Sequence, residues 1–326
     1  MILSQIKKSI LPLVCCGFAA FAHADYSNVY VFGDSLSDIG NLRAVTQDPN
    51  IPERFTNGPV AVELVATQLG HALSPSFHLL PPEVTGGVYG NNFAIASATA
   101  IDEDGDLSTP DINLPTQVGA YLQLRGGQAE SDALHIIMIG GNDLFAAQDI
   151  IINGSWGSYY NAYGRVVEAS DSVKQQIQTL VASGAENILV VNSANIGATP
   201  RTDLKKAAIF ENADSFRDYV IGWKIEGLSK NLTEVYNLSL ELAVLEVEQQ
   251  SGLDIREYDL NATFTNILNN AESLGYTNKD DACVYALTGG GFNPECNFDT
   301  FVFFDEIHPT AVTHERAATD LLEVAQ

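Results

Sequence analysis

The sequence predicts an α/β fold in which a mainly parallel sheet is covered by helices on both faces. Short apolar runs of the kind found in buried strands alternate with longer segments whose apolar residues recur at helical spacing. The run Ala133–Ile139 is apolar without interruption, as strands buried on both faces of a parallel sheet are. With 326 residues and 46% hydrophobic content, the chain is long enough to bury a sizeable core, and its sequence shows neither an internal repeat nor a linker.

The first 24 residues are expected to be a signal peptide rather than part of the fold. Lys7 and Lys8 form a basic start, and Ile10–Ala20 is an apolar run too short to span a bilayer comfortably. Residues 22–24 read Ala-His-Ala, which is the small-x-small pattern of a cleavage site. Cleavage there leaves 25–326 as a single exported domain, secreted or periplasmic. An uncleaved membrane anchor is the alternative.

The chain is strongly acidic. It carries 16 Lys+Arg against 41 Asp+Glu, and without the first 24 residues the net charge is −27. This charge argues against nucleic acid as a partner and against electrostatic adhesion to anionic lipid. It does not exclude transient contact with a membrane or micelle surface, and it leaves the oligomeric state open.

The first predicted strand leads into a serine with the surroundings of a nucleophile. Val29–Phe32 is a β-branched and aromatic run, Gly33 breaks it, and Asp34 or Ser35 can cap a following helix. In that arrangement the Ser35 hydroxyl is exposed at the carboxyl edge of the sheet. The Ser35 N–H, at the start of the helix, can face a developing negative charge. A simple helix cap is the alternative role for Ser35.

Two helices and two loops are expected before the next buried strand. Val60–Leu69 has apolar residues at helical spacing and stops at Gly70, and Asn113–Leu124 is the second helix. Residues 71–90 are rich in proline and glycine and predict a surface loop. Residues 102–111 form an acidic loop that lacks the spacing of a calcium-binding loop, so no metal site is predicted there.

An amide side chain follows the buried run Ala133–Ile139. The residues directly after the run are Gly140, Gly141, Asn142 and Asp143. An amide placed there can donate an N–H to an oxyanion, which makes Asn142 a candidate for that role. A turn residue at a strand end is the alternative for Asn142. His135 lies inside the run and is expected to be a core histidine with satisfied hydrogen bonds.

The middle of the chain continues the alternation of helices and strands. Aromatic residues at 153–163 are expected either to wall a substrate cleft or to pack as a loop. The predicted helices are Val166–Val181, 205–229, 232–250 and Ala262–Leu274, and the predicted strands are Asn187–Val191 and Leu253–Leu260.

The last apolar run, Phe301–Phe304, leads into Asp305 and His308. A serine nucleophile needs a base within hydrogen-bond reach, and histidine is the usual one because imidazole titrates near neutral pH. Asp305 lies three residues before His308, so it can orient the ring and stabilise the imidazolium. Glu306 is a rival for the orienting role. His314 is predicted to begin the exposed face of the final helix.

Four short blocks resemble those of the GDSL, or SGNH, hydrolases, and they occur in the family's order from about residue 28 to the end. The second block departs from the family pattern, which has Gly-Gly where Ala96-Ser97 stands here, and serine does not adopt a positive φ as freely as glycine. The continuation of the first block resembles the lipase branch. The blocks are Gly33-Asp34-Ser35-Leu36, Asn92-Phe93-Ala94 with Ala96-Ser97, Gly140-Gly141-Asn142-Asp143 and Asp305-Glu306-Ile307-His308-Pro309.

The resemblance implies both a fold and a set of site residues. The fold is a three-layer α/β/α sandwich with a mainly parallel, flavodoxin-like sheet. The catalytic residues are Ser35, Asp305 and His308. The oxyanion hole is formed by the Ser35 N–H, the Ser97 N–H and the Asn142 amide. No cofactor and no metal are implied.

The resemblance also implies an exported serine ester hydrolase that acts on lipid esters through an acyl-enzyme. The form of the blocks and the cysteine-bracketed loop resemble secreted bacterial phospholipase A and lysophospholipase members. Some relatives transfer the acyl group to an alcohol instead of water. A carbohydrate or short-chain acetyl esterase is one alternative. A binding protein that keeps the fold without the chemistry is another, and the complete set of site residues argues against it.

Two cysteines lie beyond residue 24, and in an exported chain Cys283 and Cys296 are expected to form a disulfide. No histidine has ligand-like spacing to them, which argues against a zinc site. The loop between them contains three successive glycines, 289–291, together with apolar residues. The disulfide either staples a surface loop or holds a lid over the Ser35 cleft, and both readings remain open.

Overall fold

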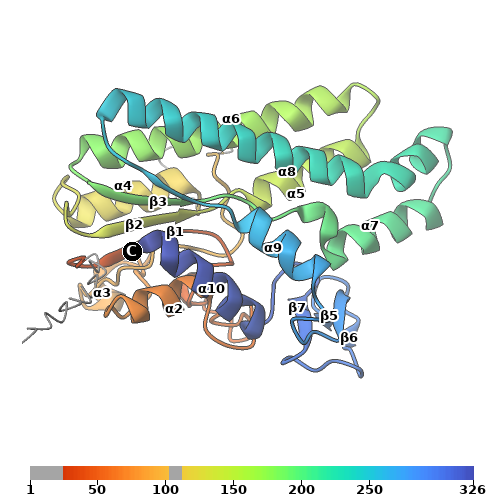
Figure 1. Cartoon of the computed structure of the whole chain (residues 1–326), viewed down its shortest axis with the longest axis horizontal. Helices are drawn as coiled ribbons and strands as arrows, with labels where there is room; N and C mark the ends of the chain where they lie inside the picture. The colour runs from red at the N-terminus through yellow and green to blue at the C-terminus, as the bar shows by residue number, and fades with distance from the viewer. Residues whose placement is uncertain (1–24, 103–111) are drawn as a thin grey trace, which may run out of the picture.

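A computed structural model of the chain describes residues 25–102 and 112–326, with a parallel sheet at its centre (Figure 1). Strands β1 to β4 lie side by side in chain order, and each pairs in parallel with its neighbour. Because helices cover both faces, β1 and β2 are buried along their whole length. The predicted parallel α/β architecture is confirmed. The strands are β1 (Val29–Gly33), β2 (Leu134–Met138), β3 (Asn187–Val191) and β4 (Arg256–Tyr258).

A fifth segment extends the sheet beyond β1. The Val31 N–H donates to the Asn91 carbonyl at 3.1 Å, and the Phe93 N–H donates to the Val31 carbonyl at 2.7 Å. The Ile95 N–H donates to the Gly33 carbonyl at 3.1 Å. Segment 91–95 therefore lies parallel to β1, on the side away from β2. This placement gives the flavodoxin-like strand order, with the second strand reduced to a short bridge.

Helices on both faces of the sheet complete three layers (Figure 1). On one face, α4, α5, α6 and α8 pack with Phe32 and Ile137 in one core cluster. On the other face, α2 and α10 pack with Val31 and Ile136. The helices are α2 (Ala61–Gln68), α4 (Leu114–Leu124), α5 (Gly141–Asn153), α6 (Ser158–Ala182), α8 (Phe216–Ser251) and α10 (Ala311–Ala325).

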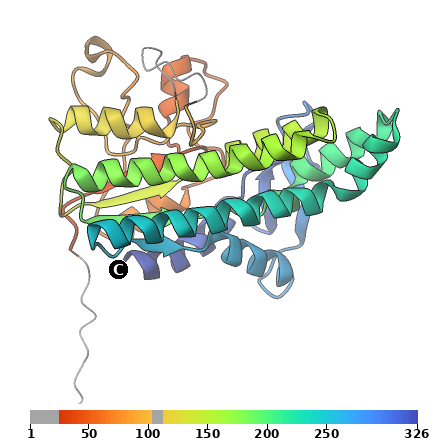
Figure 2. The same ribbon diagram turned by 90° about the horizontal axis from the view of Figure 1, so that it is seen from above.

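The longest helix differs from the sequence prediction. α8 runs unbroken for 36 residues, where the sequence predicts two segments at 205–229 and 232–250. A capping box formed by Ser215 and Asp218 starts it, and a separate helix, α7 (Pro200–Glu211), precedes it. α8 stays continuous because its interior has no proline and its buried residues recur along nearly its whole length. Figure 2 shows α6 and α8 side by side, with α7 and the start of α8 projecting past the sheet.

The aromatic residues at 153–163 lie mostly in a helix rather than a loop, because α6 begins at Ser158. Tyr159 and Tyr163 pack against the core beneath α6. Trp156 and Tyr160 are exposed. Tyr159 and Tyr163 therefore have the predicted packing role. Trp156 and Tyr160 face solvent, and neither residue lines the cavity described below.

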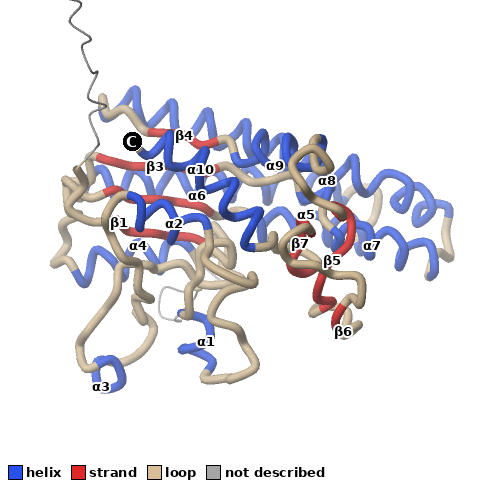
Figure 3. Tube along the Cα trace, turned by 60° about the horizontal axis from the view of Figure 1, so that its bottom comes forward, coloured by secondary structure: helices blue, strands red, loops and turns tan. Residues whose placement is uncertain are grey.

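The strand at Phe301–Asp305 does not join the main sheet, which corrects the expectation of a single sheet edge. As β7, it pairs in parallel with β5 (Asn278–Tyr285), and β5 pairs with β6 (Gly291–Phe292). Figure 3 shows this small sheet apart from β1–β4, with α9 (Leu260–Asn269) beside it. The hydrophobic pattern does not reveal β5, because its first half is polar and largely exposed.

No helix begins directly after β1, so the predicted strand–turn–helix is wrong at this point. Residues 34–38 form a turn in which the Ser37 and Asp38 N–H groups donate to the Asp34 carbonyl, and α1 (Asn41–Thr46) starts later. The predicted loop at 71–90 contains the short α3 (Pro82–Thr85), and η1 (Ile196–Ala198) follows β3. The predicted signal peptide and nearly all of the acidic loop, residues 103–111, lie outside the described residues. Within 25–102 and 112–326, no helix is long and apolar enough to cross a membrane.

Candidate active site

The turn after β1 holds Ser35 at the end of the sheet. Gly33 ends the strand where a Cβ atom would lie 2.3 Å from the Met138 carbonyl oxygen, so only glycine fits this close approach. The Gln117 side chain fixes Gly33 by accepting from its N–H and donating to its carbonyl, both at 2.8 Å. The Ser35 hydroxyl oxygen lies 2.7 Å from Nε2 of His308. This is hydrogen-bond distance for proton transfer between the two groups.

Asp305 holds the imidazole of His308 from the other side. Nδ1 of His308 lies 2.7 Å from Oδ2 and 2.8 Å from Oδ1 of Asp305. The N–H groups of Ile307 and His308 also donate to Oδ1, which fixes the carboxylate against the chain. Asp305 and His308 are both buried. With Nδ1 hydrogen-bonded to a carboxylate, Nε2 is the nitrogen that faces Ser35, as a general base must.

Asn142 lies in the first turn of α5, and its amide reaches the second block. Its Nδ2 donates to the Ala98 carbonyl at 2.8 Å, which leaves one further N–H on the amide. Gly140, just before α5, has a φ of 118° and lies against the Tyr236 ring, so a side chain could not replace its hydrogen. Asn142 and Ser35 line the same cavity.

Ser97 adopts the backbone conformation that glycine would normally supply. Its φ is 70°, so the departure from Gly-Gly leaves the left-handed geometry intact. Among the described residues, the Ser97 N–H has no hydrogen-bond partner, and neither has the Ser35 N–H. Ser97 does not line the cavity, although its neighbour Ala98 holds the Asn142 amide. The positioning of the Ser97 N–H toward an oxyanion stays a prediction.

Asp38 holds the turn after β1 against the second block, a contact that the sequence did not predict. Its buried carboxylate accepts the Ala96 N–H at 2.8 Å, next to Ser97, and the N–H groups of Gly40, Asn41 and Leu42. This carboxylate ties the first block to the second. The sequence does show an aspartate three residues after Ser35. Because polar residues are common in turns, nothing in the sequence marked Asp38 as a link to the second block.

Asp34, next to the candidate nucleophile Ser35, is an unusual carboxyl group. It is buried, and burial raises its pKa from 3.8 to about 6, although the Leu36 N–H and the nearby His308 act in the opposite direction. Oδ1 accepts the Leu36 N–H at 3.1 Å. Asp34 thus helps to shape the turn. Near neutral pH its buried negative charge destabilises the folded state.

A narrow cavity of about 90 Å³ opens beside Ser35 and is lined mainly by apolar side chains. Its lining residues come from the end of β2, from helices α5, α9 and α10, and from the short helix η1. Its apolar lining includes Met138, Phe145, Ile196, Leu260, Phe264, Ile267, Ile307 and Ala317. An apolar pocket with a few polar groups at one end suits a ligand with a hydrocarbon chain and a polar reacting group.

The two other histidines considered in the sequence behave differently from each other. His135 is a core histidine as predicted, because its Nε2 lies 2.9 Å from the Tyr121 hydroxyl and its Nδ1 lies 3.2 Å from the Asn187 carbonyl. His314 is buried, so its predicted exposure is wrong. Its Nδ1 accepts the Ala61 N–H, which belongs to the start of α2. Burial first, and the nearby His308 second, lower the pKa of His314 to about 3, and the ring lines the cavity in its neutral form.

Glu306 does not orient His308. Its buried carboxylate accepts the N–H groups of Ala286, Leu287 and Thr288 at 2.9–3.1 Å, which fixes the turn after β5. Glu306 therefore anchors the loop bracketed by the cysteines. The orienting contact belongs to Asp305.

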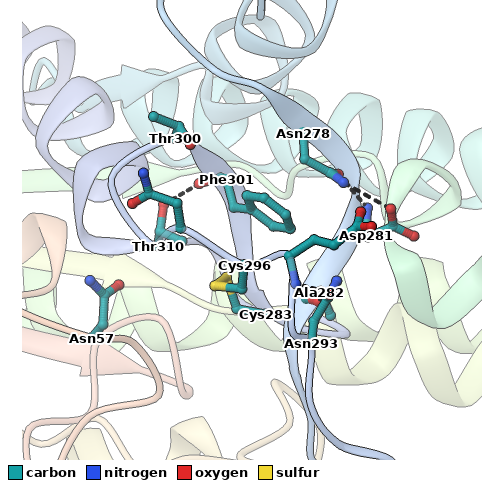
Figure 4. Close-up of a disulfide and its surroundings, with 12 residues drawn as sticks. Asn57, Asn278, Asp281, Ala282, Cys283, Asn293, Cys296, Thr300, Phe301 and Thr310 are labelled. Carbon is teal, nitrogen blue, oxygen red and sulfur yellow. Dashed lines mark hydrogen bonds between the residues drawn. A yellow bond between two sulfur atoms is a disulfide. The ribbon is translucent and has the colours of Figure 1, made fainter.

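The structure pairs Cys283 with Cys296, whose Cα atoms are 5.0 Å apart (Figure 4). The bridge closes the β5–β6 hairpin and the chain that follows it. No residue of 283–296 lines the cavity beside Ser35. This arrangement favours a staple over a lid. Within 25–102 and 112–326, no three His, Cys, Asp or Glu side chains gather in a way that could hold a metal ion.

The chain is similar in sequence to a family of known proteins. A family model described as GDSL-like Lipase/Acylhydrolase matches residues 29–321. Lipase 1 of Photorhabdus luminescens is 27% identical over 342 residues, covering 90% of this chain and 49% of Lipase 1, so the chain spans about half the length of that relative. A GDSL esterase/lipase of Arabidopsis thaliana is 26% identical over 291 residues, covering 80% of this chain and 74% of the relative. The crystal structure of phospholipase A1 from Streptomyces albidoflavus is similar with a TM-score of 0.42 and 13% identity, covering 92% of this chain and all of that one.

Proposed function

Because the chain belongs to the GDSL-like lipase/acylhydrolase family, whose members hydrolyse carboxylic esters, we propose that it is an exported lipid esterase of the phospholipase A or lysophospholipase type. The narrow cavity beside Ser35 carries this proposal, because its mainly apolar lining suits the hydrocarbon of an acyl chain better than the polar ring of a sugar. Export rests on the pattern of residues 1–24, and 25–326 is proposed to fold as one domain.

In the proposed first step, Oγ of Ser35 attacks the ester carbonyl while its proton passes to Nε2 of His308, 2.7 Å away. Negative charge develops on the carbonyl oxygen. The free N–H of the Asn142 amide and the backbone N–H groups of Ser35 and Ser97 stabilise it. Asp305 stabilises the positive charge on the imidazolium through Nδ1.

In the second half of the reaction, the tetrahedral intermediate collapses and the C–O bond to the alcohol breaks. His308 returns the proton to the leaving oxygen, and the acyl group remains as an ester on Ser35. A water molecule then attacks that ester, His308 takes its proton, and the free acid leaves. If an alcohol attacks in place of water, the same steps transfer the acyl group, so acyltransferase activity needs no further residue.

A substrate panel tests the proposal directly. It contains p-nitrophenyl esters of rising chain length, lysophospholipids, diacyl phospholipids and acetylated sugars. The proposal expects kcat/KM to rise from the acetyl ester to longer acyl chains, together with hydrolysis of lysophospholipid. Turnover confined to acetylated sugars would instead identify a carbohydrate acetyl esterase, and no turnover of any ester would favour a binding protein.

Two adjacent alanines of α10 provide a matched pair for the acyl cavity. Ala317 lines it, whereas Ala318 is equally buried but does not. Ala317→Leu should lower turnover of long-chain esters relative to the acetyl ester, because the added methylene groups occupy the space of the chain. Ala318→Leu adds the same volume and should leave that ratio unchanged. If both folded variants had the same ratio of long-chain to acetyl ester turnover, the cavity beside Ser35 would not be the site of the acyl chain.

A further inference from the structure

Three exposed aromatic side chains lie on one face of α8 near its start, where α7 and α8 meet at the projecting end of the molecule, and we call them the aromatic tip. Large aromatic residues are seldom this accessible when no partner covers them. One of the two tryptophans of the chain is among them. The members, with their exposed fractions, are Phe216 (76%), Tyr219 (45%) and Trp223 (70%).

Helical spacing brings these side chains to one end of the protein. Phe216, Tyr219 and Trp223 are three and four residues apart, so they lie on one face of α8. Arg217, in the first turn of α8, donates to the carbonyl of Ile152 at 3.1 Å and to that of Ile151. These bonds hold the end of α5 against the start of α8. Figures 1 and 2 show this end projecting beyond the sheet.

The acidic surface of the protein is interrupted in this region. Residues 201–230, which contain α7 and the first part of α8, carry six Lys and Arg against five Asp and Glu. The rest of the chain carries ten against thirty-six. Lys224, beside Trp223, is exposed and has no ion pair among the described residues. The aromatic tip can therefore approach a lipid headgroup layer without the repulsion that the remaining surface would meet.

The tip also lies close to the proposed reaction site. Thr199 lines the acyl cavity, and α7 runs from the next residue, Pro200, toward the tip. Twelve helical residues span about 18 Å, so the tip and the cavity are about one helix length apart. A lipid surface that contacts the tip would thus lie near the cavity that must receive one of its acyl chains.

We infer that the aromatic tip docks the enzyme onto the surface of a zwitterionic phospholipid bilayer or micelle. Trp and Tyr rings prefer the headgroup region because each has an apolar body and a polar N–H or O–H. Flanking lysine and arginine stems can lie along the apolar surface and keep their charges in water. This inference deepens the proposed function, since an enzyme that cleaves aggregated lipid must first reach the aggregate.

A vesicle-binding measurement with the Ser35→Ala variant tests docking without hydrolysis. In a Trp156→Phe background, phosphatidylcholine vesicles should shift the remaining tryptophan emission to shorter wavelength, because Trp223 lies in the tip. Phe216→Ala/Tyr219→Ala/Trp223→Ala in the same background should lower the vesicle-bound fraction in a flotation assay about tenfold. Circular dichroism checks that α8 remains folded.

α8 offers a matched control farther along its length. Leu238, Leu242 and Leu245 have the same helical spacing and comparable exposure, at 57%, 57% and 46%, but they lie among acidic residues. Their triple alanine variant should bind vesicles as the parent does. Equal binding by the parent and the tip variant, or no binding by the parent, would overturn the inference. Loss of a dimer in the tip variant would also overturn it, because a second copy of the chain would then be the partner.

The docking surface and the proposed lipid esterase activity can be tested by different measurements, so either one can be wrong while the other is correct. With soluble short-chain esters, the tip variant of the active enzyme should keep the parental kcat/KM. With micellar lysophospholipid, its KM should rise. Vesicle binding without turnover of any lipid would contradict the proposed substrate and leave the docking surface standing.

Discussion

Nε2 of His308 lies 2.7 Å from Oγ of Ser35, although 273 residues separate them in the chain. Two different sheets create this contact. Ser35 follows β1 of the main sheet, whereas His308 follows β7 of the small sheet. The candidate nucleophile and base therefore meet at the junction of two sheets, and the packing of the small sheet against the body of the protein sets their distance.

Removal of the Asn142 amide should slow the chemical step. Asn142→Ala is expected to reduce kcat about 10²- to 10³-fold, the usual effect of losing one oxyanion donor. Ser193→Ala is a suitable control because Ser193 lines the same cavity and has no proposed part in the chemistry. Wild-type kcat in a folded Asn142→Ala variant would remove Asn142 from the oxyanion hole.

Adjacent carboxylates should have separable roles. Asp305→Asn is expected to lower kcat about 10⁴-fold by favouring the wrong imidazole tautomer, with little effect on the melting temperature. Glu306→Gln should instead lower the melting temperature, since its carboxylate holds three N–H groups of the β5–β6 turn, and should retain most of kcat. Steady-state kinetics and calorimetry on both variants distinguish the roles. The reverse pattern would transfer the orienting role to Glu306.

Asp34 should make stability fall as the pH rises from about 4 to 6. Burial raises its pKa from 3.8 to about 6, so in this window the folded protein binds a proton that the unfolded chain releases. Above about pH 6, the ionised Asp34 lowers the free energy of unfolding by a constant amount, at most about 3 kcal/mol. Asp34→Asn cannot ionise, and its amide oxygen can still accept the Leu36 N–H. The difference in unfolding free energy between variant and wild type should therefore grow in favour of the variant from pH 4 to pH 6.

Denaturant titrations at several pH values give that difference, because other titrating groups cancel between the two proteins. A difference that does not change between pH 4 and pH 7 would show that the Asp34 pKa is not raised.

The Cys283–Cys296 bridge should matter for stability and not for acyl-chain preference. A disulfide that closes a loop of this size contributes about 3 kcal/mol in the chain-entropy model, so Cys283→Ala/Cys296→Ala should unfold at a lower temperature. The ratio of long-chain to short-chain ester turnover should stay at the wild-type value, since 283–296 does not line the cavity. A changed ratio in the folded double variant, or after cleavage within 288–292, would restore the lid.

The sequence predicted those parts of the fold that hydrophobic pattern controls. The apolar runs correspond to β1, β2, β3 and β7, and Leu253–Leu260 contains β4, because buried strands of a parallel sheet need apolar residues on both faces. The sequence did not predict β5, because Asn278–Asp281 is polar and largely exposed. The pairing of β5 with β7 also depends on residues that are distant in the sequence.

In the candidate site, contacts between residues close in sequence could also be predicted, whereas contacts between distant residues could not. The spacing of Asp305 and His308 is local, so their contact could be expected from the chain alone. The burial of His314 could not, because its partner is the Ala61 N–H, 253 residues away. The role of Glu306 could not be predicted either, because the N–H groups that its carboxylate accepts lie 18 to 20 residues earlier in the chain.

Covalent labelling of Ser35 tests the central claim most directly. The enzyme is incubated with a serine-directed alkyl phosphonate, digested, and mapped by mass spectrometry. We predict one adduct per chain, on the peptide that contains Ser35, formed in step with the loss of esterase activity. Ser35→Ala should take up no label, remain folded, and lose activity by about 10⁶-fold. An active enzyme that stays unlabelled, or that carries the adduct on another residue, would contradict the account.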